Sequence, residues 1–212
     1  MVNYREYIKM LDDYIYDMTD IIPYTDEQRT RMQERFKYEW DKYSDSIVTD
    51  KAKWAKRKTA IDSSGKVRKG TTPMSTWGRV HVSIQQSEPD ESNVFQEVIE
   101  PFPELPEQQW WSWQYMIDNT IPFHKDPSTQ CWIGINVIGD QEIRFATDDG
   151  ERQKDGTPIG QMPYQIALVN SKGLHAPVTD GSPRLILRRV FVHHSFSEIK
   201  TYLQENIKCG SG

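Results

Sequence analysis

Two short segments of the chain combine histidine and aspartate in a way that could bind a metal ion. His124 and Asp126 lie two residues apart just before an apolar run, and side chains two apart in an extended segment project to the same face. His175 lies much later, after a Ser-Lys-Gly turn. Two neutral imidazoles and one carboxylate leave open positions on iron(II) for further ligands. The sequence therefore predicts a metal site made of His124, Asp126 and His175.

An arginine shortly after the third ligand could hold an acidic co-substrate. Arg184 opens the run Arg-Leu-Ile-Leu-Arg-Arg-Val-Phe, which is typical of a strand. A guanidinium can bind a carboxylate through two parallel hydrogen bonds, so Arg184 could neutralise the distant carboxylate of a 2-oxo acid. Because side chains alternate along a strand, Arg188 faces the same way and is the alternative candidate.

Four further residues are weighed as parts of a site. Trp132 and Asn136 lie on one face of an expected strand and would line the pocket if that face points inward; an amide inside a barrel normally has a specific hydrogen-bond partner. His193 and His194 lie at the junction of the last strand and the last helix. We assign them a structural or surface role, although a cupin-type site could recruit one of them.

The elements that must position these residues are mostly short strands. From residue 77 onward, β-branched and aromatic stretches are separated by Pro, Gly, Asn and Asp clusters, which predicts a mainly β sandwich or jelly roll rather than a βαβ fold. In one stretch, apolar residues occupy every second position, as in a strand buried on one face. The expected strands are residues 77–85, 94–99, 110–117, 130–138, 142–146, 164–169 and 184–193.

Helices are expected at both ends of this region. Apolar residues at three- and four-residue intervals predict helices over residues 4–19 and 25–44, and a closing helix over 195–207. The polar stretch 147–160, with two Asp-Gly turns, is expected to be a hairpin loop that could act as a substrate lid. The chain thus divides into an N-terminal helical extension, a polar connector, a β domain with a C-terminal helix, and a disordered tail: residues 1–58, 59–76, 77–207 and 208–212.

Composition bears on the class of protein, its cellular location and its partners. The chain is 36% hydrophobic and 27% charged, as in soluble globular proteins. It has no apolar run near the roughly 20 residues that span a bilayer, no apolar segment typical of a secretory signal, and only two cysteines. We therefore expect a cytoplasmic protein that does not associate with a membrane. The net charge of −5 argues against general nucleic-acid binding, although the basic segment 51–69 could dock an acidic partner.

The order His-x-Asp, distant His and then Arg resembles the Fe(II)/2-oxoglutarate-dependent dioxygenase superfamily. The sequence His124-Lys125-Asp126, which leads into residues 132–136, is similar to aspartyl/asparaginyl hydroxylase-like and prolyl hydroxylase-like members, as is the sequence from His175 into residues 184–187. The resemblance covers roughly residues 77–194. The interval between His175 and Arg184 is one residue shorter than the commonest family spacing, and a proline directly precedes the arginine.

The resemblance implies a double-stranded β-helix, a jelly-roll, cupin-like fold, with His124, Asp126 and His175 as metal ligands and Arg184 as the clamp for 2-oxoglutarate. It also implies Fe(II), 2-oxoglutarate and dioxygen as cofactor and co-substrates, and hydroxylation of an unactivated C–H bond with release of succinate and CO2. We expect the substrate to be an amino-acid side chain, in a small molecule or a polypeptide. Two alternatives remain: a non-enzymatic jelly-roll binding protein, and a cupin-type metalloenzyme that does not use 2-oxoglutarate.

Overall fold

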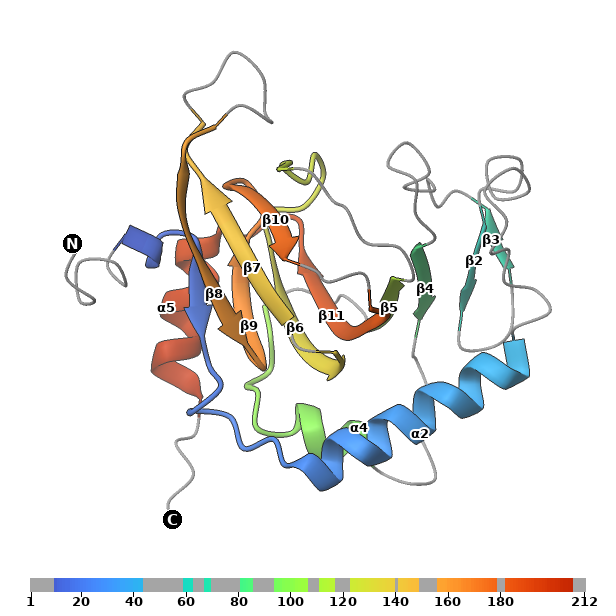
Figure 1. Ribbon diagram of the computed structural model, residues 1–212. Helices are drawn as coiled ribbons and strands as arrows, with labels where there is room; N and C mark the ends of the chain where they lie inside the picture. Colours follow the sequence, from blue (N-terminus) through green and yellow to red (C-terminus); the bar gives the residue numbers. More distant parts are fainter. Residues whose placement is uncertain are drawn as a thin grey trace.

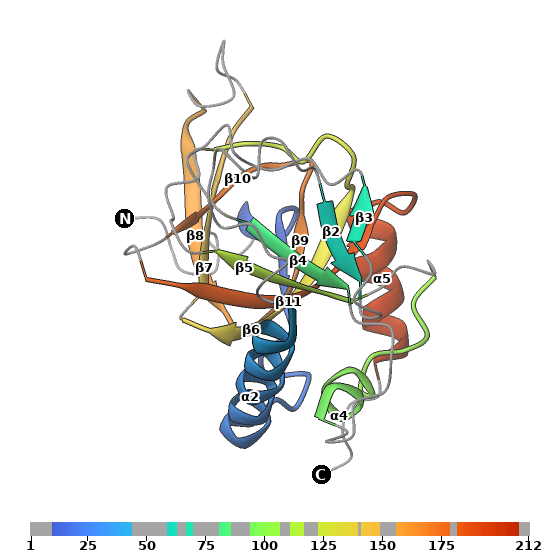
Figure 2. The same ribbon diagram turned by 90° about the vertical axis from the view of Figure 1, so that its right-hand side faces the viewer.

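Most of the fold consists of two largely antiparallel β-sheets that pack face to face (Figures 1 and 2). The computed structural model describes residues 10–43, 59–62, 67–69, 81–85, 94–106, 111–116, 123–139, 141–148, 156–178 and 182–207. Within these residues the mainly β architecture that the sequence predicted is confirmed.

The larger sheet has eight strands in the described part of the chain. Their order from edge to edge is β1 (Ile15–Asp17), β9 (Ile166–Asn170), β6 (Cys131–Ile138), β11 (Arg184–Phe191), β5 (Ser112–Met116), β4 (His81–Gln85), β2 (Thr59–Asp62) and β3 (Val67–Lys69). The smaller sheet has the order β10 (Leu174–Val178), β7 (Gln141–Ala146) and β8 (Pro158–Tyr164). Every pairing is antiparallel except that of β2 with β4.

The chain crosses between the sheets repeatedly. Strand β5 lies in the larger sheet, the segment at His124 pairs with β10 of the smaller sheet, and β6 returns to the larger one. Strands β7 and β8 then lie in the smaller sheet, β9 in the larger, β10 in the smaller and β11 in the larger. These crossings place β10 and β11 on opposite sides of one interior, and they bring residues from distant parts of the sequence to face each other.

Side chains from both sheets fill the space between them. The members of this interior cluster on the central strands are Trp132, Ile143, Phe145, Tyr164, Ala167, Val169 and Ile186. The other face of the larger sheet is covered by three helices, α2 (Asp26–Tyr43), α4 (Val94–Ile99) and α5 (Phe196–Asn206). Figure 2 shows α5 on the side of the larger sheet opposite β7, β8 and β10.

The central strand β6 is buried on both faces, so the expectation that it buries only one face is wrong. Ile133 and Ile135 pack under the helices, whereas Trp132 faces the smaller sheet. The alternating pattern misled because the second face carries one large ring, one glycine and one amide rather than a run of aliphatic residues. A second sheet covers them all.

Two of the expected helices fit the structure. Helix α5 begins after Ser195, whose hydroxyl accepts from the backbone N–H of Glu198 while the Glu198 carboxylate accepts from the backbone N–H of Ser195. This reciprocal arrangement satisfies two N–H groups that the helix cannot. Helix α2 begins after Thr25, which exchanges similar hydrogen bonds with Gln28. Both starts therefore have a local cause that can be recognised in the sequence.

Two expected elements are wrong. Residues 94–99 form helix α4, not a strand; Val94 and Val98 are both buried, which is the four-residue spacing of a helix face. The helix expected over residues 4–19 is wrong at Ile15–Asp17, which form strand β1 along the edge of β9. There Tyr14 accepts a backbone hydrogen bond from Asn170, so pairing with the sheet edge overrides the helical spacing.

Other differences concern the polar stretches. Part of the expected connector 59–76 forms the paired strands β2 and β3, and the end of the expected loop 147–160 forms β8. The expectations for residues 1–9, 44–58, 70–80, 149–155 and 208–212 lie outside the described residues, including the tip of the possible lid and most of the basic segment. Among the helices that are described, none combines the length and apolar character that would let it cross a membrane.

Candidate metal centre

The structure brings together the three ligands that the sequence predicted. One potential ligand atom from each of His124, Asp126 and His175 lies within 4.8 Å of the others, and this is the group of metal-binding side chains found among the described residues. His124 Nε2 is 3.7 Å from Asp126 Oδ1, and the two imidazole rings have centroids 4.5 Å apart. Both histidines are buried and Asp126 is half-buried. This set can coordinate one divalent cation.

The backbone fixes the relative position of these ligands. His124 and His175 form an antiparallel bridge in which each N–H donates to the carbonyl of the other, at 3.0 Å in both directions. Residues paired directly across strands carry side chains on the same face, with Cβ atoms about 5 Å apart. The Asp126 N–H donates to the carbonyl of Ser171 at 3.0 Å. The two ligand segments are thus joined before any metal binds.

The turn that precedes His175 is tied to the segment around Asp126. The Asn170 carboxamide oxygen accepts from the backbone N–H of Lys172 at 3.0 Å and closes the turn. The Lys172 ammonium then donates to the carbonyls of Asp126 and Pro127, at 3.2 and 3.0 Å. Lys172 therefore connects the turn directly to the backbone of a ligand.

Burial and hydrogen bonding keep His175 in the form that binds a metal. Burial, together with the neighbouring His124, lowers the pKa of His175 to about 4, so its imidazole is neutral at neutral pH. Its Nδ1 lies 2.9 Å from the carbonyl oxygen of Gly173. A carbonyl can only accept, so Nδ1 carries the proton and Nε2 is left to bind the ion.

Arg188 holds the carboxylate of the site. Its Nη2 donates to Asp126 Oδ2 at 2.8 Å, and its guanidinium carbon lies 4.7 Å from the ring centre of Trp132. Burial alone would raise the pKa of Asp126, but Arg188, His175 and His124 more than offset it and the pKa is lowered. The carboxylate is thus charged, with Oδ1 directed toward His124.

We expect Arg188→Met to weaken metal binding by about 10- to 100-fold, as removal of other groups that orient a ligand does. The substitution removes the hydrogen bond that fixes Asp126 but keeps an unbranched side chain over Trp132. Calorimetric titration of Mn(II) into the metal-free protein measures the effect. Arg189→Met is the matched control, because Arg189 lies next along β11 on the opposite face. Equal losses in both variants would contradict the assigned role.

We expect the metal-free protein to lose stability as the pH falls from 7 to 4. The unfolded chain protonates His175 near its ordinary pKa of 6.5, whereas the folded protein does so only near 4, so protons stabilise the unfolded state in this window. The loss is on the order of 3 kcal/mol. The lowered pKa of Asp126 acts in the same direction at lower pH. Urea unfolding with a chelator present measures it.

The control for this pH dependence is His175→Gln, which cannot titrate. Its unfolding free energy should fall less between pH 7 and pH 4 than that of the unsubstituted protein. Parallel curves for the two proteins would show that His175 is not the group responsible.

Arg184, the arginine predicted to bind the co-substrate, lies in the same interior, further than Arg188 from the metal ligands. Arg184 is only 2% exposed, and its Nη1 donates to the carbonyl of Val178 at 3.4 Å. Gly139, in the turn after β6, has φ +76° and lies so close that an added Cβ would be 3.3 Å from Arg184 Cγ. The structure thus distinguishes the two candidates: Arg188 holds Asp126, and Arg184 lies at the other end of the interior.

Trp132 and Asn136 do face the interior. The Trp132 ring lies across Gly134, where an added Cβ would be 2.6 Å from its Cζ3. Trp132 Nε1, Arg188 Nε and Asn136 Oδ1 are buried without a hydrogen-bond partner. Buried polar atoms normally have a partner. Several in one interior could bind a polar ligand or water that enters it.

Sequence analysis missed one polar residue of this interior, Tyr164. Burial raises its pKa to about 12, although the charges of Arg184 and Arg188 act to lower it, so its hydroxyl keeps its proton at neutral pH. Its position at the end of β8, where that strand follows a polar stretch, provides no local signal. His193 and His194 do not belong to the metal-binding group among the described residues.

Comparison with known proteins gives no family for the chain. No protein-family model and no curated protein matches it. The crystal structure of AviO1 from Streptomyces viridochromogenes is similar with a TM-score of 0.48 and 12% identity, over 91% of this chain and 97% of that chain. The crystal structure of TT1209 from Thermus thermophilus has a TM-score of 0.25 and 14% identity, over 41% and 76%. The function must therefore be inferred from the site.

Proposed function

We propose that the protein is a non-haem Fe(II)- and 2-oxoglutarate-dependent oxygenase that hydroxylates an unactivated C–H bond and releases succinate and CO2. The observation that carries the proposal is the convergence of His124, Asp126 and His175 at one interior that also contains a buried arginine. Two histidines and one carboxylate are the ligand set typical of such iron sites.

The sheet arrangement supports a double-stranded β-helix, the fold expected from the resemblance. In that fold a chain alternates between two facing four-stranded sheets. Here β9, β6, β11 and β5 form the middle of one sheet, and β8, β7, β10 and the segment at His124 follow one another in the other. The metal-binding group lies where this last segment meets β10, on the side of the interior.

The interior also fits a dicarboxylic 2-oxo acid. Arg184 places a guanidinium in a nearly dry environment, where an ion pair with a carboxylate is strong. The Tyr164 hydroxyl, protonated at neutral pH, lies near enough for the charge of Arg184 to affect its pKa and can donate a second hydrogen bond. The unpartnered Trp132 Nε1 adds a further hydrogen-bond donor. The distal carboxylate of such an acid would therefore meet one cation and one hydroxyl donor.

Iron bound at this site, with dioxygen as oxidant and 2-oxoglutarate as co-reductant, would supply the chemistry for C–H hydroxylation, which no side chain of the protein can supply. The side chains have defined tasks beside them. Arg188 orients Asp126, the Gly173 carbonyl sets the tautomer of His175, and Arg184 neutralises the distal carboxylate. Trp132, only 6% exposed, packs its ring in the interior and would help to exclude water there.

We further propose that the substrate is an amino-acid side chain, free or in a polypeptide, on the basis of the sequence resemblance. The deciding experiment is turnover of 2-oxoglutarate to succinate with a panel of amino acids and peptides. Anaerobic addition of Fe(II) and 2-oxoglutarate should also produce a weak visible charge-transfer band that needs both components. A protein that binds Fe(II) but gives neither the band nor succinate would exclude the proposal and favour a cupin-type metalloenzyme that uses no oxo acid.

A further inference from the structure

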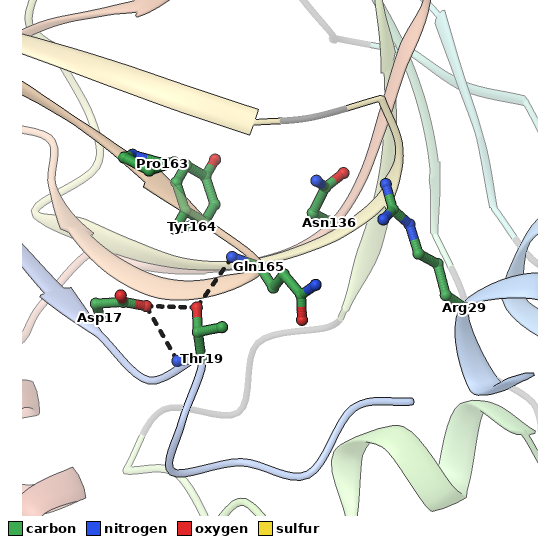
Figure 3. A pocket seen from close by; sticks show the side chains of 7 residues that line it. All are labelled: Asp17, Thr19, Arg29, Asn136, Pro163, Tyr164 and Gln165. Atoms are coloured by element: carbon green, nitrogen blue, oxygen red, sulfur yellow. Dashed lines mark hydrogen bonds between the residues drawn. The ribbon is translucent and has the colours of Figure 1, made fainter. Parts of the chain in front are cut away.

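A cavity lies at the end of the interior away from the metal-binding group. It has a volume of about 280 Å3, and its lining includes Arg29, Asn136, Tyr164 and Gln165 (Figure 3). On β7, Gln141 pairs with Tyr164, whereas Phe145 pairs with His175. Four residues of strand at about 3.3 Å each separate the two levels by roughly 13 Å. The cavity and the metal-binding group thus lie at opposite ends of one interior.

Two side chains, Tyr164 and Asn136, belong to both spaces. Tyr164 packs in the interior cluster, with its ring 3.7 Å from the position of a Cβ added at Gly134, and it also lines the cavity. Asn136 is 2% exposed, and its Oδ1 has no hydrogen-bond partner. In Figure 3 both side chains project to the same side of the strands that carry them. Tyr164 therefore lies where the cavity meets the interior, and Asn136 lines the cavity beside it.

The polar groups of the cavity suit an acidic ligand on the side near Asn136. The Arg29 guanidinium is anchored through hydrogen bonds to the carbonyls of Val137 and Gly139, at 3.2 and 3.0 Å, and reaches toward Asn136 in Figure 3. A carboxylate also lines the cavity, but Asp17 Oδ1 accepts from the Thr19 backbone N–H and hydroxyl, away from Asn136. A carboxylate that entered past Tyr164 would therefore meet a cation.

We propose that Tyr164 determines the length of the oxo acid that the site accepts. This inference rests on the proposed function. With Tyr164 in place, the distal carboxylate stops at Arg184 and the Tyr164 hydroxyl, which fits 2-oxoglutarate. With a small residue there, the cavity joins the interior and admits 2-oxoadipate, which is one methylene longer and whose carboxylate reaches toward Arg29.

The reaction with the longer acid balances in the same way as the proposed one. Oxidative decarboxylation of 2-oxoadipate breaks the bond between C1 and C2 and gives glutarate and CO2. One oxygen atom of O2 enters the new carboxylate of glutarate, and the other enters the C–H bond of the substrate as a hydroxyl. No reductant other than the oxo acid is needed.

The test compares both oxo acids in the unsubstituted protein, Tyr164→Ala and Tyr164→Phe. A single methylene changes discrimination by about 10- to 200-fold. We expect the ratio of kcat/KM for 2-oxoadipate to that for 2-oxoglutarate to rise at least about tenfold in Tyr164→Ala. In Tyr164→Phe the ring still separates the spaces, so the ratio should stay low while KM for 2-oxoglutarate rises.

A binding measurement gives a second readout that does not need turnover. Calorimetric titration of each acid into the zinc-substituted protein should show the same reversal of preference in Tyr164→Ala. Should that variant fail to fold, Tyr164→Leu opens part of the same passage and retains more core volume. Unchanged preference in a folded, metal-binding Ala or Leu variant overturns the inference. Absence of 2-oxoglutarate binding and turnover in the unsubstituted protein would instead reject the proposed function itself.

Discussion

His175→Ala is expected to abolish both metal binding and turnover. The substitution removes one of three ligands, and His175 has the lowered pKa that keeps its imidazole available for a metal at neutral pH. Loss of a group that only orients a ligand costs about 10- to 100-fold in metal affinity, so loss of the ligand itself should exceed about 100-fold. Titration of Fe(II) under anaerobic conditions and succinate release measure the two effects.

The matched control is His193→Ala, since His193 is an exposed histidine outside the metal-binding group. It should leave Fe(II) affinity and succinate release close to those of the unsubstituted protein. If His175→Ala keeps its Fe(II) affinity, or if His193→Ala loses it, the assignment of the ligands is wrong. Far-ultraviolet circular dichroism checks that both variants remain folded.

Arg184→Met is expected to raise the dissociation constant for 2-oxoglutarate while leaving Fe(II) affinity nearly unchanged. Methionine retains much of the side-chain length but no charge, so a carboxylate would be buried without its partner. Loss of one member of a buried ion pair costs about 2–5 kcal/mol, which corresponds to roughly 30-fold to more than about 1,000-fold in affinity. Calorimetry with the Mn(II)-loaded protein measures it directly.

Arg144→Met provides the control, because Arg144 also lies on a strand but is exposed and packs against the Phe123 ring. It should bind 2-oxoglutarate as the unsubstituted protein does. If Arg184→Met binds 2-oxoglutarate with unchanged affinity, Arg184 is not the clamp. Arg188 would then be tested by the same titration, with the metal saturating so that loss of metal affinity does not obscure the result.

The pair His124 and Asp126 could be predicted from the sequence because its signal is local, whereas the prediction of His175 rested on the order of motifs 49 residues apart. His124 and Asp126 are two residues apart before a strand, and such spacing alone places both on one face. Leu185 and Leu187 of β11 pack toward the helices. Because side chains alternate along a strand, Arg184 and Arg188 must then face the interior. The hydrogen-bond partner of each arginine could not be predicted in this way. That Arg188 pairs with Asp126 depends on which strands become neighbours.

The errors in the fold arise where tertiary contacts outweigh local pattern. Residues 94–99 are too short a run for periodicity to separate a helix from a strand, and burial of Val94 and Val98 against the helical layer decides in favour of the helix. Ile15 has helical spacing with the apolar residues around it, yet it pairs with the edge of β9 and forms a strand. Strand β8 contains two prolines and a glycine and lies at the edge of its sheet, where proline is tolerated.

The mutual backbone hydrogen bonds of His124 and His175 separate folding from metal loading. Since the chain itself aligns two of the three ligands, the apoprotein should reach its native state during synthesis and bind a metal ion afterwards. Metal then adds stability only according to its free concentration relative to its dissociation constant. A metal ion that is lost could then be replaced in the native protein, with no cycle of unfolding and refolding.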